Sequence, residues 1–214
     1  AEDGIRDLVR SRGLGDVYKR QGKSLIETAN YPRYNLHEIV RQFASQKNID
    51  VSQQQKIHQS YADYYSAALA EIGERNPHQF TVEALDQIED DLQNFLSAWK
   101  FYSDRCEINK IIQNTEPLYQ FFNIRSRFQV GIDLFQNTFN KVQNILSGDL
   151  LRVNLANRIG MLAHHSRKQE LAFEMFSLGH HLAQAAGNIR ELGIASIGLG
   201  GHYLRDKQYK EALH

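Results

Sequence analysis

Residues 159–176 read IGMLAHHSRKQELAFEMF, and this segment carries the main signal for the architecture of the chain. Gly160 and Ala172 are twelve residues apart within it, on either side of the polar turn at 166–168. The pattern predicts two antiparallel helices joined by a short turn, because polar residues end one apolar periodic segment and begin the next. We expect the small residues to lie where the helix axes come closest, with Phe176 filling the space beside them.

The same pattern recurs forty residues further on, where residues 199–214 read LGGHYLRDKQYKEALH. Gly200 and Ala212 are again twelve residues apart around a polar turn, and Tyr203 follows the glycine by three positions. A weaker copy lies 41 residues before the first one, with Tyr119 at the glycine position and Gly131 at the alanine position. Self-similarity at a fixed period of this length predicts stacked helical hairpins.

These offsets resemble those of tetratricopeptide repeats, whose pattern places Gly, Tyr, Ala and Phe at the same spacing. The period of about forty is longer than usual and resembles the variant found in bacterial signal-transduction ATPases of the STAND class, where it forms a superhelical sensor arm. The resemblance implies an α-solenoid. It assigns the repeat-packing positions to Gly160, Ala172, Phe176, Gly200, Tyr203 and Ala212.

The segment RYNLHEIVRQFA at residues 33–44 resembles the end of the winged-helix domain in STAND and NB-ARC ATPases. Residues 24–27 and 33–36 are short enough to be two strands of a β-wing with a turn between them. In that family a His followed by an acidic residue reaches toward the phosphates of a bound nucleotide. The resemblance therefore implies that His37 senses nucleotide, but only together with an ATPase domain. The alternative is that His37 simply caps or packs the helix that follows the wing.

Amphipathic helices are predicted between the wing and the repeats. Ser52 is a good N-cap for a helix that extends to about Gly73, and Thr81 can cap the next one. Pro117 is expected to kink or split a helix over residues 107–123, and Ser126 is expected to cap the helix after it. The clearest apolar stripe, at steps of three and four, consists of Leu85, Ile88, Leu92, Phe95, Trp99 and Tyr102.

The predicted fold class is all-α, a helical bundle running into a tetratricopeptide-like α-solenoid, with a small β-wing remnant near the N-terminus. Residues 1–21 keep no sustained apolar period and are expected to be a non-native or disordered lead-in. We assign 22–47 to a winged-helix remnant and 48–112 to a helical linker bundle. Residues 113–214 are assigned to the repeats, the last of which is truncated.

Composition excludes several classes of function. The 25 basic and 25 acidic residues give a formal net charge of zero, which provides no general attraction to nucleic acid or anionic membranes. The single Cys106 allows neither an internal disulfide nor a thiolate metal site, which favours a cytoplasmic location. Apolar runs stay well below the roughly 20 residues of a membrane helix.

The residues also provide no recognisable catalytic constellation, so we expect a non-enzymatic chain without cofactors. Gly22-Lys23-Ser24 resembles the end of a phosphate-binding loop, but Val17 stands where that loop requires glycine. The pairs His164-His165 and His180-His181 could each offer at most one ligand to a common metal, since adjacent helical side chains diverge. We therefore predict no metal site.

The function predicted from these signals is a protein–protein interaction or sensor arm of a multidomain signal-transduction ATPase or transcriptional regulator. The expected partner is a protein or peptide, with a small-molecule inducer as a second class. Nucleic acid would be contacted only through missing domains. The alternative is a winged-helix DNA-binding module with a helical dimerisation tail, which would require a basic recognition helix before the wing. An enzyme with an unrecognised helical site is a third interpretation.

Overall fold

The computed structural model describes residues 26–28, 34–36, 50–77, 79–145, 149–210 and 212. The chain divides into two compact units, residues 1–55 and 56–214. In the first unit, strands β1 (Ile26–Thr28) and β2 (Tyr34–Leu36) pair antiparallel, with Ile26 opposite Leu36. The turn between the strands and the helix expected after them lie outside the described residues. The β-wing of a winged-helix domain therefore stays a prediction.

The rest of the described chain is helical, which confirms the all-α prediction for this part. Consecutive helices are joined by short turns, so each helix runs back along its neighbour. The seven helices in the described residues are α3 (Val51–Arg75), α4 (Val82–Arg105), α5 (Ile108–Ile124), α6 (Phe128–Val142), α7 (Asp149–His165), α8 (Gln169–Ala185) and α9 (Ile189–Arg205).

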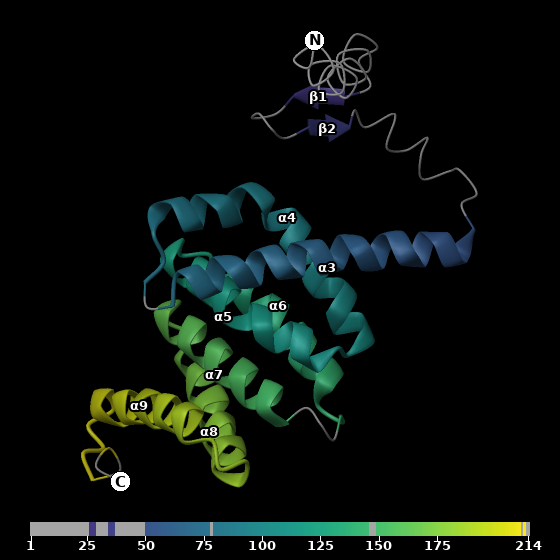
Figure 1. Ribbon diagram of the computed structural model, residues 1–214. Helices are drawn as coiled ribbons and strands as arrows, with labels where there is room; N and C mark the ends of the chain where they lie inside the picture. The colour runs from purple at the N-terminus through teal and green to yellow at the C-terminus, as the bar shows by residue number, and fades with distance from the viewer. Residues whose placement is uncertain are drawn as a thin grey trace, which may run out of the picture. The chain divides into compact units, whose positions relative to one another are not determined.

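Packing proceeds along the chain from one helix to the next (Figure 1). From α4 onward, each helix contacts its successor, and contacts also join α4 to α6, α5 to α7 and α7 to α9. Contact between near neighbours along the chain is the organisation of a solenoid, so this part of the molecule is solenoid-like. The helix at its centre is α7, which packs against α5, α6, α8 and α9.

The turns between helices repeat the same backbone geometry. Ser126, Arg167 and Lys207 adopt left-handed conformations with φ of 55°, 62° and 60°, at intervals of 41 and 40 residues. In each case the next residue closes a Schellman motif by donating its N–H to the carbonyl five positions earlier. These bonds join Arg127 to Phe122 at 2.8 Å, Lys168 to Ala163 at 2.9 Å and Gln208 to Tyr203 at 2.8 Å. Cys106 and Gly187 have the same conformation and are followed by the same bond, so this turn geometry ends five of the described helices and does not by itself mark a period of forty.

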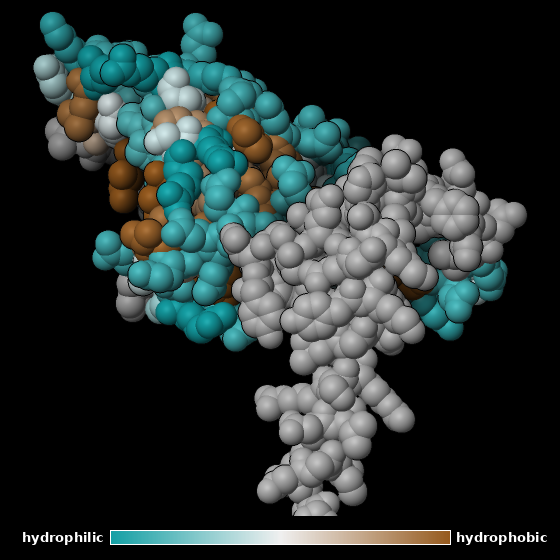
Figure 2. All heavy atoms as spheres, turned by 90° about the horizontal axis from the view of Figure 1, so that it is seen from above, coloured by the Kyte–Doolittle hydropathy of each residue, from teal (hydrophilic) through white to brown (hydrophobic). Residues whose placement is uncertain are grey.

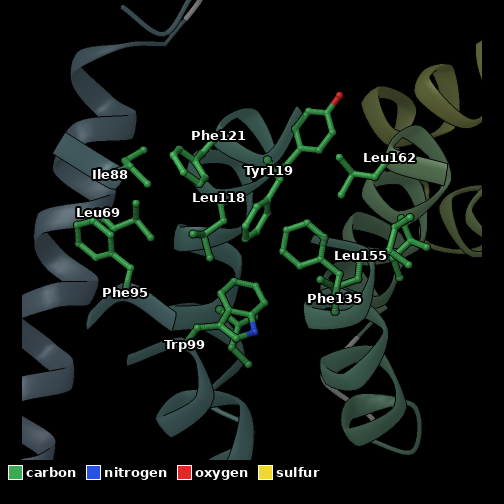
Figure 3. Packing of buried hydrophobic residues seen from close by; sticks show 14 of the residues in the cluster. Leu69, Ile88, Phe95, Trp99, Leu118, Tyr119, Phe121, Phe135, Leu155 and Leu162 are labelled. Carbon is green, nitrogen blue, oxygen red and sulfur yellow. The ribbon is translucent and has the colours of Figure 1, made fainter. Parts of the chain in front are cut away.

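One hydrophobic core extends from α3 to α8 and includes residues on both sides of the boundary expected near residue 112. Figure 3 shows Phe95 and Trp99 of α4 facing the side chains of α5 and α6. The Trp99 ring lies 5.5 Å from Phe135, and its Nε1 donates to Oγ1 of Thr138 at 2.8 Å. All six residues of the predicted α4 stripe are buried, which confirms that this stripe organises the core.

Local signals at the helix ends gave mixed results. Thr81 caps α4 as predicted, since its side chain accepts a hydrogen bond from the N–H of Ala84 at 3.2 Å. The prediction for Ser126 was wrong: this residue belongs to the turn that ends α5, and Arg127 precedes α6 without a side-chain cap. The helix also continues through Pro117 without being split. Gly73 of α3 leaves room for the proline ring, because a Cβ there would lie 2.6 Å from its Cγ.

Candidate functional site

A group of polar and charged side chains, buried except for Glu116, joins α5, α7 and α9, the first helices of successive hairpins. Arg158 on α7 donates from Nε to Oε2 of Glu116 on α5 at 2.8 Å, and from Nη2 to Oε1 of Glu191 on α9 at 3.3 Å. Asn157 donates from Nδ2 to Oε2 of Glu191 at 2.8 Å and to its backbone carbonyl at 2.9 Å. We call Glu116, Asn157, Arg158 and Glu191 the charge cluster. It links three hairpins through one guanidinium.

The two most buried members of the charge cluster carry opposite charges. The side chains of Arg158 and Glu191 are 5% and 3% exposed, so each charge is compensated by the other and not by water. The ring of Tyr119 lies 5.3 Å from the Arg158 guanidinium carbon. Burial raises the pKa of Tyr119 to about 12, which keeps its hydroxyl protonated near neutral pH.

Phe176 of α8 lies against both α7 and α9. A Cβ added to Gly160 would lie 2.9 Å from Cδ1 of this ring. A Cβ added to Gly198 would lie 2.6 Å from Cδ2 on the other side of the ring. Glycine at both positions therefore gives the ring its space. Ala172 and Phe176 are buried in the same core cluster, at 3% and 4% exposed. The structure thus places Gly160 against Phe176 and buries Ala172 in the same core, while the close approach of Gly160 to Ala172 stays a prediction.

The equivalent residues of the next hairpin are packed less tightly. Among the described residues, a Cβ on Gly200 would have only the carbonyl oxygen of Ala212 within 4 Å, at 3.9 Å. Tyr203 is half-buried, and its ring lies 5.9 Å from that of Phe173 on α8. Ala212 is also half-buried. His37 lies outside the described residues, so its role as a nucleotide sensor stays a prediction.

An apolar pocket of about 360 Å³ opens between α7 and α9, beside the Phe176 ring. Met161 lines it from α7, and Ile194 and Ile197 line it from α9. The polar groups in its lining are the imidazoles of His164 and His165. The His165 ring stacks on Phe128 with the centroids 6.0 Å apart. Burial, followed by the neighbouring His164, lowers the pKa of His165, which favours its neutral form near pH 7.

Other hollows and apolar side chains mark the surface of the helical unit. A pocket of about 230 Å³ lies over Ala70 and Phe80 and is bordered by Glu74. A groove of about 390 Å³ runs between α4 and α6. Figure 2 shows hydrophobic side chains gathered in patches between hydrophilic ones on the face that it displays. The large hydrophobic side chains exposed on the later helices include Ile124, Val130, Leu150, Ile189, Ile197 and Leu204.

The histidine pairs are not assembled into a metal site in the part of the chain that the structure describes. The ring planes of His164 and His165 are inclined to each other by 76°, and those of His180 and His181 by 87°. Among the described residues, no group of three or more His, Cys, Asp or Glu side chains is placed to hold a metal ion. Within the same residues, none of the helices combines the length and the apolar character needed to cross a membrane.

The charge cluster and the α7–α9 pocket were both missed from the residues alone. The clue to the cluster was α7 itself, because apolar residues occur on all of its sides and such a helix is normally buried. A buried Arg158 then requires a partner. The clue to the pocket was the number of glycines in α9, which weaken a helix unless space is needed beside them.

No family model matches this chain, and no curated protein matches it. The functional interpretation therefore rests on the residues and on their geometry.

Proposed function

We propose that this chain is a non-catalytic interaction or sensor arm of a multidomain signal-transduction ATPase or transcriptional regulator, built from tetratricopeptide-like hairpins. The observation that carries the proposal is the stacking of successive helices joined by one recurrent turn geometry, found at Cys106, Ser126, Arg167, Gly187 and Lys207. Hairpins that repeat in this way present an extended surface, and stacked-hairpin proteins use such surfaces to bind partners. The STAND assignment itself rests on the resemblance of the residues.

The exposed side chains support a protein or peptide partner. Ile189 and Ile197 of α9 are 84% and 79% exposed, although both are large and apolar. Isolated exposed apolar residues are common, but two on one helix beside an apolar pocket are typical of a surface that a partner covers. A peptide or helix would bury these side chains without requiring any catalytic group.

The charge cluster supports a relay along the arm. Arg158 contacts α5 and α9 at once, so a shift of either helix changes the environment of the same guanidinium. A partner that favours one arrangement of the hairpins would then bias the others, and with them the docking of the arm on neighbouring domains. Relay of this kind needs no residue of the arm to perform chemistry.

The coding sequence upstream of Gly22 provides the test. We expect it to encode a P-loop ATPase followed by a winged-helix domain, in frame with residues 22–214. Any other fold at that place would overturn the proposal.

A mobility-shift assay with nonspecific duplex DNA at low salt tests the alternative function. The interaction arm should leave the duplex unshifted, because its formal net charge is zero. Clear binding that weakens with salt would instead favour the winged-helix module with a dimerisation tail.

A further inference from the structure

The residues that line the pocket from α9 have repeat equivalents on α7. With a period of forty residues, Gly198 and Gly201 of α9 are equivalent to Arg158 and Met161 of α7. Arg158 reaches across to Glu116 of α5, and its Nη1 lies 3.9 Å from the Met161 sulfur. Two long side chains of α7 therefore correspond to two glycines of α9.

The wall of the pocket also changes in polarity between the two hairpins. Ile194 and Ile197 of α9 are equivalent to Asn154 and Asn157 of α7. Two amides are thus replaced by two branched hydrocarbons at the positions that line the pocket. From α7 to α9, two of these equivalent positions lose a long side chain and two lose an amide.

Packing does not explain the glycine at position 201, which differs from the equally uncrowded Gly193 in lining the pocket. Gly198 is needed because a Cβ would overlap the Phe176 ring, but a Cβ on Gly201 would meet no heavy atom of the described residues within 4 Å. Glycine inside a helix lowers its stability relative to alanine. Gly201 lines the pocket, so we expect a long side chain at this position to reduce the space beside it.

We propose that the α7–α9 pocket binds a small, uncharged apolar molecule of one or two rings. This inference deepens the proposed sensor function and rests on it. A volume of about 360 Å³ lies at the lower end of the roughly 300–1,000 Å³ typical of small-molecule sites. Lining of this kind disfavours a charged ligand, which would lose its hydration without gaining a charged partner. The imidazoles of His164 and His165 can satisfy one polar atom of the ligand.

Binding in this pocket would act on the arm because its two walls belong to successive hairpins. A ligand in contact with Met161 of α7 and with Ile197 of α9 favours the arrangement in which both walls are close. The same pair of helices is joined by Arg158 and Glu191, so the ligand would bias the charge cluster as well.

Titration of the 214-residue chain with the neutral fluorescent dye N-phenyl-1-naphthylamine tests the inference. We expect saturable binding of one dye per chain. Gly201→Met restores the side chain found at the equivalent position of α7, and we expect it to weaken binding at least tenfold. The variant should also raise the melting temperature, since methionine favours the helix more than glycine does, so a loss of binding cannot be ascribed to unfolding.

Gly193→Met is the matched control on the same helix. A Cβ on Gly193 also meets no heavy atom of the described residues within 4 Å, and Gly193 does not line the pocket. We expect this variant to gain thermal stability in the same way and to bind the dye as the wild type does. Ile197→Asn, which restores the amide of the preceding hairpin, should weaken binding without filling the pocket.

Several results would overturn the inference. These are dye binding that never saturates, unchanged affinity in Gly201→Met, or an equal loss in Gly193→Met. Sedimentation velocity tests whether a second copy of the chain occupies the pocket. If the wild-type chain self-associates and Gly201→Met does not, the pocket is an interface between copies and not a ligand site. A negative result in these tests does not contradict the proposed interaction-arm function, because the upstream coding sequence tests that function independently.

Discussion

Arg158 holds one positive charge between the buried carboxylate of Glu191 and the carboxylate of Glu116, which is 41% exposed. Arg158→Met would leave Glu191, whose side chain is 3% exposed, as a buried carboxylate without a cation. Removing one partner of a buried ion pair costs about 3–5 kcal/mol. We expect urea unfolding of this variant to show a loss of that size. The double variant Arg158→Met/Glu191→Met should recover part of it, because both charges are then absent.

Lys141→Met is the matched control for Arg158→Met. Lys141 pairs with Asp104 at 2.6 Å, but these side chains are 35% and 46% exposed. An exposed pair contributes about 0–1 kcal/mol, so this variant should lose far less stability. Equal losses for Lys141→Met and Arg158→Met would contradict the importance given to the charge cluster.

Two glycines allow a second comparison at single residues. A Cβ on Gly179 of α8 would overlap Oδ1 of Asn157, a side chain that two hydrogen bonds to Glu191 hold in place. We expect Gly179→Ala to destabilise the chain by about 1–3 kcal/mol, as overpacking usually does. Gly193→Ala should instead stabilise it by about 0.5–1 kcal/mol, since nothing crowds that position. Denaturant midpoints that move in the same direction for both would contradict this account.

Among the elements, α3 and α4 are joined by a hydrogen bond whose contribution depends on pH. Tyr102 donates to Oδ1 of Asp63 at 2.7 Å. This bond, followed by one from Gln59, holds the pKa of Asp63 below its usual range. The unfolded chain then binds the proton more readily, so the stabilisation is present above about pH 4 and is lost as pH falls through the native pKa.

Tyr102→Phe should reduce this dependence, while Gln59 and Lys110 still act on Asp63. Because the Asp63 side chain is 45% exposed, we expect the pH-dependent part of the stability difference to stay below about 1 kcal/mol. The difference between wild type and variant should be larger near pH 7 than at acid pH. Tyr64→Phe, at a position that is 68% exposed on the same helix, should show no such trend. A difference that is constant with pH would show that Asp63 is not the responsible group.

An element could be predicted where the residues that determine it lie close together in the sequence. The α4 stripe and the Thr81 cap were predictable, because periodicity and capping involve residues close in sequence. The positions of the polar turns after α7 and α9 were also predictable, but their left-handed conformation was not, because Ser126, Arg167 and Lys207 are residues that seldom adopt positive φ. Their conformation is held by hydrogen bonds to the preceding helix, and residue type does not mark it.

At the scale of the molecule, the charge cluster shows what the residues could not indicate. Arg158 and Glu191 are 33 positions apart, and each is typical of a solvated helix face when considered alone. They meet only because α5, α7 and α9 stack side by side. The period of forty predicted the order of the hairpins, whereas the partners across them depend on how the helices approach.

The same stacking makes burial uneven along the helical unit. Helices α7 and α9 have 17 residues each, but α7 buries ten of them and α9 buries only Glu191 and Ala195. Local opening free energies follow buried contacts. The helix α9 should therefore open without unfolding α7, and this makes it the element whose position a partner or ligand can change at least cost.

Hydrogen exchange followed by mass spectrometry tests this expectation over the whole chain. We expect the amides of α9 to exchange well before those of α7. Glu191→Gln should speed exchange in α9 more than in α7, because it weakens one of the few buried contacts of α9 and leaves the ten buried positions of α7 in place. Gly193→Ala should slow exchange in α9 alone, since it favours the helix without touching a neighbour. Were α7 and α9 to exchange together in every variant, the unit would open as one body, and an arm that responds through its last helix would have no physical basis.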